Sequence, residues 1–260
     1  MKHNFPRRMA LGALSAGAVA GLVVMVPGAA YASATTTTTT TATTGSNTTA
    51  PVSSPRCTPA LFSQAQALVE SDLSARVTQL NALASAAGNT ANHLTTSDRQ
   101  TLQNDITTVE LPGIQALQPK VQQAANCAQL RPLAHEMVFN FRVYVVMTPQ
   151  THLTIVIDDE TYVEGVFVNL EPQIATAIAN AQAAGKNVTA AQVAFADLKS
   201  QVTSAQGETA GQSATILAQT PSGYPGNWQV FLAARTNATN AHSDLHAAFT
   251  DAQQIRTDLQ

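Results

Sequence analysis

The sequence predicts an all-α protein: an antiparallel bundle of long helices, arranged as extended helical hairpins and closed by one disulfide. Three observations lead to this prediction. Apolar residues recur at three- and four-residue spacing through most of residues 57–260, the repeat of an amphipathic helix. Helix-start and helix-stop residues divide that region into long segments. The two cysteines, Cys57 and Cys127, flank the first pair of segments.

The first predicted helix begins directly after Cys57. Thr58 is a suitable N-cap, and Pro59 fits the first turn because its missing N–H would have no partner there. Gly88 and Asn89 end the helix. Its apolar face comprises Phe62, Val69, Leu73, Leu80 and either Leu83 or Ala84.

A second helix is predicted from Ser97-Asp98, with Leu102, Ile106 and Val109 on one face. Proline removes a helix hydrogen bond, so we expect an interruption at Leu111-Pro112-Gly113 and another at Pro119. The chain then runs on to Cys127.

If these two segments lie antiparallel, the Cys57 and Cys127 sulfurs meet at the same end of the hairpin. If the chain is exported, its even cysteine count favours a disulfide over the alternative of two free buried thiols. A bond closing about seventy residues stabilises the fold by roughly 4 kcal/mol in the chain-entropy treatment.

The middle of the chain carries two conflicting signals. Residues 137–147 and 153–157 are rich in β-branched and aromatic residues, which favours strands. From Leu153 to Ala181, however, a seven-residue apolar repeat continues with Glu160 as the exception, which favours a coiled-coil type of helix. The amount of β structure in 137–168 therefore stays open.

We interpret the repeat as one long helix over about 149–184, which Gly185 ends. Pro149 is expected either to sit at the start of this helix or to kink it away from a helix over 132–147, and Pro172 is expected to kink it.

Two further helices are predicted. One covers 189–218, and the other runs from Trp228 to the end of the chain. Between them, residues 220–226 contain two prolines and two glycines, which indicates a loop.

Residues 1–32 have the three parts of a secretory signal peptide. Lys2, Arg7 and Arg8 precede an uncharged apolar run, and Ala30-Tyr31-Ala32 supplies the small residues of a cleavage site. Cleavage after Ala34 and an uncleaved membrane anchor are the alternatives, and the choice between the general and twin-arginine export routes stays open. We predict a secreted or cell-envelope location.

Residues 33–56 form a predicted disordered linker ahead of a helical bundle domain at 57–260. Of the fifteen residues from Thr35 to Thr49, eleven are Thr, so this stretch has too few apolar side chains to build a core.

Charge excludes some classes of partner. Removing residues 1–32 takes away three basic residues and no acidic ones, so the formal charge changes from −3 to −6. Without a basic cluster, we expect no nucleic-acid binding and no polybasic membrane contact. We also expect no stable membrane span after cleavage.

The segment Phe141-Arg142-Val143-Tyr144, followed by Pro149-Gln150 and His152-Leu153, resembles exported bacterial helical proteins of uncharacterised role. The helix start at 94–98 and the Ala-rich helices that follow extend the similarity over about 60–215. The resemblance implies a helical bundle or coiled coil and no particular activity.

His242 and His246 are the candidate metal ligands. Four residues apart on a helix, they share one face, and either His135 or His152 could add a third ligand. Ser243 replaces the glutamate that follows the first His in zinc proteases. The alternative is a pair of polar histidines on a half-exposed face.

Three other groups of residues are candidate sites. The acidic run Asp158-Asp159-Glu160 with Glu164 could hold a hard cation, but acidic residues on a helix are usually solvated or paired with a base. Arg142, inside an apolar run, could anchor a ligand beside Tyr144 or form an ion pair with Glu136 or with the acidic run. The aromatic residues of 224–228 could contact sugar or a partner, or form a packed turn.

No nucleophile elbow or phosphate-binding glycine loop occurs, so the sequence predicts no catalytic residues, no cofactor and no enzyme. The predicted role is structural or interactive, with an envelope protein or polymer as the partner and the oligomeric state open. The alternative is an exported module that binds a metal or small ligand through His242 and His246.

Overall fold

The computed structural model describes residues 57–260, and the predicted signal peptide and linker lie outside these residues. Every regular element of the described part is helical, and it contains no strand. The all-α prediction is therefore confirmed, and within the described chain residues 137–168 contribute helix rather than sheet. The elements are α1 (Pro59–Gly88), α2 (Thr96–Asn104), the π-helix η1 (Asp105–Glu110), α3 (Leu111–Gln123), α4 (Cys127–Phe139), the π-helix η2 (Val143–Met147), α5 (Thr148–Ala183), α6 (Thr189–Thr209), α7 (Gln212–Leu217), the 3₁₀ turn η3 (Pro221–Gly223) and α8 (Trp228–Asp258).

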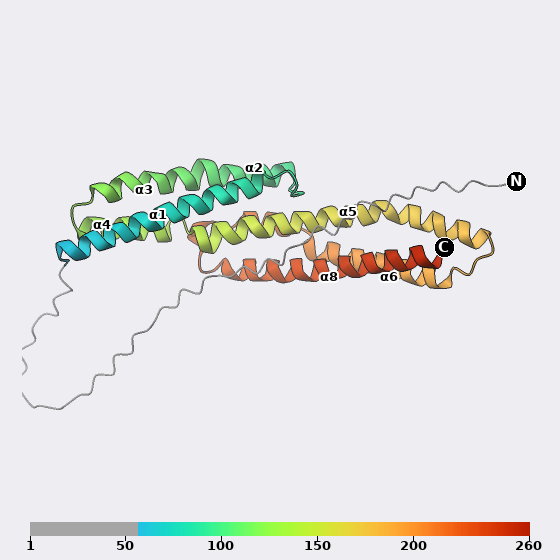
Figure 1. Cartoon of the computed structure of the whole chain (residues 1–260). Coiled ribbons are helices and arrows are strands. Elements are labelled where there is room, and N and C mark those ends of the chain that lie inside the picture. The colour runs from blue at the N-terminus through green and yellow to red at the C-terminus, as the bar shows by residue number, and fades with distance from the viewer. Residues whose placement is uncertain (1–56) are drawn as a thin grey trace, which may run out of the picture. The chain divides into compact units, whose positions relative to one another are not determined.

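The first helical hairpin pairs α1 with the α2–η1–α3 segment, and α4 folds back along it (Figure 1). Its core is built from the apolar face predicted for the first helix together with residues of the returning segment and of α4. Cys57 and Cys127 form the predicted disulfide at the open end of this hairpin, with their Cα atoms 6.2 Å apart. The main buried residues are Leu73, Leu80, Leu83, Ile106, Ile114, Leu117, Val121 and Met137.

The predicted interruptions of the second helix are wrong. The chain is helical without a break from Thr96 to Gln123, and Pro119 lies inside α3. Pro112 falls in the first turn of α3, directly after the π-helical turn η1. There the bonding pattern already changes from i→i+5 to i→i+4, so the missing proline N–H is accommodated.

The boundary between the next two helices also differs from the prediction. A helix over 132–147 was predicted, but α4 ends at Phe139 and the chain turns at Arg142. Arg142 has φ 44° and ψ 42°, the left-handed conformation, and η2 then runs into α5 without a loop. Pro149 occupies the first turn of α5, where proline is well tolerated.

The long helix α5 is confirmed, with Pro172 inside it. Gly185, at φ 81°, ends it. The Gly185 N–H donates to the Gln182 carbonyl (2.9 Å) and the Lys186 N–H to the Ala181 carbonyl (3.1 Å). This pair of bonds is the Schellman motif, which requires a left-handed residue and so favours glycine.

The second hairpin consists of α6 and α8, which pack along each other and against α5 (Figure 1). Small residues permit the close approach, since alanines fill much of the interface. The buried set includes Phe167, Ile178, Ala191, Leu198, Val202, Ala205, Ala241, Leu245, Ala248 and Ile255.

The predicted helix 189–218 is broken in the structure. It ends at Thr209, and α7 begins at Gln212. The intervening Gly211 has φ 70°, a left-handed conformation that stops a helix. The predicted loop at 220–226 is confirmed, with a single 3₁₀ turn at its start.

Candidate functional site

The acidic run on α5 places four carboxyl side chains, Asp158, Asp159, Glu160 and Glu164, within seven residues of one helix. We expected it to be solvated or paired with arginine. Instead, Asp158, Glu160 and Glu164 are only 6%, 7% and 4% exposed. Within residues 57–260 no arginine or lysine lies within ion-pair distance of them. Buried carboxylates without a cation need other donors, and each of these has one on a different element.

Asp158 connects α5 to α2 and α7. Its Oδ2 accepts from the Thr95 backbone N–H at 2.9 Å, and its Oδ1 accepts from Ser213 Oγ at 2.6 Å. Thr95 is also the N-cap of α2, where its Oγ1 accepts from the Asp98 N–H. Burial raises the pKa of Asp158, the two hydrogen bonds oppose this, and the nearby Asp98 carboxyl raises it further.

Asp159 binds the segment between α1 and α2. One of its oxygens accepts from the His93 backbone N–H (2.7 Å) and lies 3.1 Å from His93 Nδ1. The His93 ring also stacks on Tyr162, with 3.7 Å between the ring centroids. This pair is partly exposed, so its ion-pair contribution to stability is small.

Glu160 and Glu164 join α5 to the second hairpin. Glu160 Oε1 lies 2.9 Å from His242 Nδ1 on α8, and Glu164 Oε1 accepts from Thr209 Oγ1 on α6 at 2.8 Å. Burial raises the pKa of both glutamates, and each hydrogen bond works against that rise. The acidic run is therefore a junction at which α5 is joined to α2, α6, α7, α8 and the segment before α2.

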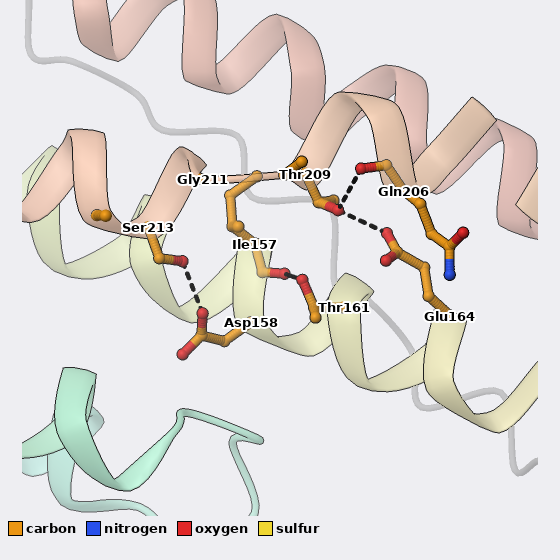
Figure 2. Close-up of a pocket in the computed structure, with 10 residues that line it drawn as sticks. Ile157, Asp158, Thr161, Glu164, Gln206, Thr209, Gly211 and Ser213 are labelled. Atoms are coloured by element: carbon orange, nitrogen blue, oxygen red, sulfur yellow. Dashed lines mark hydrogen bonds between the residues drawn. The ribbon is translucent and has the colours of Figure 1, made fainter. Parts of the chain in front are cut away.

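A cleft of about 360 Å³ opens beside this junction, where α6 gives way to α7 (Figure 2). Asp158 and Glu164 flank it, each already bonded to a hydroxyl of the opposite wall (Figure 2). No cationic side chain lines it, so its charge favours a cation over an anion. Its lining residues are Ile157, Asp158, Thr161, Glu164, Gln206, Thr209, Ala210, Gly211, Ser213 and Ala214.

The predicted metal pair lies on α8. His242 and His246 are both exposed and one turn apart. The structure brings neither proposed third ligand into place: His135 stacks on Phe139 (4.2 Å), and His152 is half-buried on α5, where burial lowers its pKa. Within 57–260 no three His, Cys, Asp or Glu side chains gather around a common point. Metal binding by this pair stays a prediction.

Arg142 makes none of the ion pairs that we considered. Its guanidinium carbon lies 5.0 Å from the Phe139 ring centroid and 4.5 Å from that of Tyr224. Tyr144, the expected neighbour, contacts Arg76 instead at 5.2 Å. The loop residue Tyr224 is thus packed against Arg142, which agrees with the interpretation of 224–228 as a packed turn.

Sequence reasoning missed the partners of the acidic run: His93, Thr95, Thr209 and Ser213. These residues lie far from the run along the chain and belong to no motif. One residue could have indicated that such donors exist. Glu160 occupies an inward position of the seven-residue repeat, and a buried carboxylate needs a hydrogen-bond donor.

No protein-family model matches the sequence, and no curated protein or solved structure matches it. The resemblance of the central segment to exported helical proteins therefore stays a prediction. Among the helices of residues 57–260, none combines the length and apolar character that a membrane crossing requires.

Proposed function

We propose that this protein is an exported, non-catalytic interaction protein. In this proposal the helical domain binds a component of the cell envelope, the Thr-rich segment is a spacer, and the signal peptide is removed. The proposal builds on the helical architecture, the disulfide and the way in which the acidic junction uses its carboxylates.

The observation that carries the proposal is the use of Asp158, Glu160 and Glu164 as interhelical hydrogen-bond acceptors. A general acid or base must reach a substrate proton. Each of these carboxyl groups already accepts a hydrogen bond from a neighbouring element. These three carboxyl groups thus hold the helices together.

The surface supports an interaction role. Several large apolar side chains of the described chain are more than a third exposed, and Trp228 and Leu232 lie one turn apart at the start of α8. Tryptophan is enriched among the residues that dominate binding energy at interfaces. The full set comprises Leu61, Leu68, Val109, Val138, Phe139, Tyr144, Tyr162, Val168, Val193, Trp228 and Leu232.

The disulfide supports an extracytoplasmic location, because such bonds persist in oxidising compartments. It also joins α1 to α4 next to the point where the predicted linker enters the helical domain. A pull on the linker would therefore be transmitted to two helices rather than one.

A retention experiment tests the proposal. Purified protein is incubated with washed envelopes of the producing cells, comparing wild type with the double variant Trp228→Ala/Leu232→Ala. If the two side chains form an interface hot spot that contributes about 2 kcal/mol to binding, the double variant should bind roughly 30-fold more weakly than wild type. Leu68→Ala, an exposed apolar residue on α1, is the matched control and should bind like wild type. Equal retention of all three proteins, or a mature N-terminus at Met1, would contradict the proposal.

One observation favours metal binding as a second function. Metal-bound histidines commonly hold a carboxylate on the ring nitrogen that does not bind the metal. His242 Nδ1 contacts Glu160 in this way, which leaves Nε2 for a metal shared with His246. Calorimetric titration with Zn²⁺ tests the pair: His246→Ala should abolish binding, and His135→Ala, an exposed histidine on α4, should leave it unchanged. Equal binding by both variants would exclude this site.

A further inference from the structure

Arg142 has a backbone conformation that its residue type disfavours. It is the one non-glycine residue in 57–260 with a positive φ. The left-handed conformation costs an L-residue about 1–2 kcal/mol. Such outliers persist where surrounding structure enforces them, and they concentrate at functional positions.

This conformation places the guanidinium against two aromatic rings from separate parts of the chain. Phe139 comes from the last turn of α4, and Tyr224 from the loop before α8. His135 stacks on Phe139 in turn, with 4.2 Å between centroids. The rings hold the guanidinium by cation–π contact and leave its hydrogen-bonding edge uncommitted.

No counter-ion occupies that edge. Residues 1–56 contain no Asp or Glu, and within 57–260 no carboxylate lies within ion-pair distance of Arg142. Its Nε is buried and has no acceptor, and its terminal nitrogens make no hydrogen bond to the described residues. A guanidinium fork matches the two oxygens of a carboxylate or phosphate, so this one is arranged for an oxyanion.

Exposed apolar side chains lie close by along the chain. Phe139 is itself 46% exposed, and Trp228, four residues after Tyr224, is 43% exposed. Exposed aromatic side chains and an arginine suit a ligand that alternates anionic groups with flat, weakly polar surfaces, as carboxylated sugars do.

We propose that Arg142, framed by Phe139 and Tyr224, binds the carboxylate of an acidic glycan. The inference rests on the proposed function for the setting, since an exported protein meets envelope polymers. It adds to that function a specific residue and a ligand class.

Titration of the full chain with oligogalacturonate tests the site, with neutral malto-oligosaccharide of equal length as the control sugar. Arg142→Gln removes the guanidinium, and Arg235→Gln removes an exposed arginine from α8 as the matched control. Loss of a charge-assisted bond should weaken binding roughly 10- to 100-fold in the first variant only. The affinity of Arg142→Lys should lie between those of wild type and Arg142→Gln, because lysine retains the positive charge but lacks the planar guanidinium fork.

A direct readout accompanies the affinities. The Arg142 Nε–H resonance of ¹⁵N-labelled protein should shift on addition of oligogalacturonate and stay in place with the neutral sugar. If Arg142→Gln disturbs folding, Arg142→Asn replaces it, because asparagine tolerates the left-handed conformation. An unshifted resonance, or equal binding by Arg142→Gln and Arg235→Gln, would overturn the site.

A glutamate-rich peptide titrated in parallel tests the ligand class: tighter binding of the peptide than of the sugar would overturn the glycan assignment. The envelope-retention experiment stays independent. If Trp228→Ala/Leu232→Ala reduces retention while Arg142 shows no response, the interaction function stands and the oxyanion site fails.

Discussion

Glu110 provides the most quantitative prediction. It lies at the end of η1 within the first hairpin, is 6% exposed, and its Oε2 has no hydrogen-bond partner among the described residues. Burial, assisted by the charge of Asp105, raises the pKa of Glu110 from its ordinary 4.5 to about 7. The folded state therefore prefers the protonated acid, whereas the unfolded chain ionises at the ordinary value.

The sign of the pH dependence follows from proton counting. Between pH 4.5 and 7 the folded state binds more protons at Glu110 than the unfolded state, so this group lowers stability as pH rises through that window. Well above pH 7, Glu110 is ionised in both states and its contribution to stability no longer changes with pH. The pKa difference corresponds to roughly 3 kcal/mol, at about 1.4 kcal/mol per pH unit.

Glu110→Gln removes the titration and retains the shape of the side chain. We expect the variant to gain stability relative to wild type as pH rises from 4.5, reaching about 3 kcal/mol of relative gain by pH 8. Urea unfolding followed by circular dichroism from pH 4 to 8 measures this difference. Glu171→Gln on α5, a glutamate that is not buried, is the control. If the difference in unfolding free energy between Glu110→Gln and wild type does not vary with pH, the pKa of Glu110 is not raised in the folded state.

Three further predictions concern the fold. Gly211→Ala should lower the unfolding free energy by about 1 kcal/mol, because φ at this position is 70°. Gly207→Ala should raise it by about 1 kcal/mol, because Gly207 lies inside α6 with open space around its Cβ position. If both variants shift the melting temperature in the same direction, this account of the α6–α7 break is contradicted. Ser213→Ala should cost about 2 kcal/mol at pH 7 and less in acid, where Asp158 protonates; an unchanged urea midpoint would show that the bond contributes nothing. Replacing Cys57 and Cys127 by serine should cost about 4 kcal/mol, and loss of less than 1 kcal/mol would indicate that the hairpin is already closed in the unfolded chain.

Helix type and extent follow from local patterns, which explains why most of the fold was predictable. The start of α1 at Pro59 and the end of α5 before Gly185 depend on neighbouring residues alone. The disulfide could also be predicted, because two helical segments of similar length bring Cys57 and Cys127 to one end of the hairpin. The β-rich composition of 137–157 was overridden by packing, as weak propensities commonly are.

Local patterns also misplaced several boundaries. Prolines were expected to interrupt the chain at Pro112 and Pro119, but both fit within continuous helix. The turn at Arg142 carried no sequence signal, since arginine rarely adopts positive φ. Its contacts with Phe139 and Tyr224 join segments far apart in the chain, and only tertiary structure brings these residues together.

The glycines of the α6 region show where the information in the sequence ends. Gly207 and Gly211 occupy similar Ala- and Thr-rich surroundings, yet Gly207 continues a helix and Gly211 stops one. The break lies beside the junction, between Thr209, which donates to Glu164, and Ser213, which donates to Asp158. The sequence alone determined that this protein forms long amphipathic helices joined by a disulfide, because these features depend on spacing along the chain. Tertiary structure alone decided where the helices break and which donors meet the buried acids, because a buried carboxylate is stabilised by any donor that the fold brings within reach.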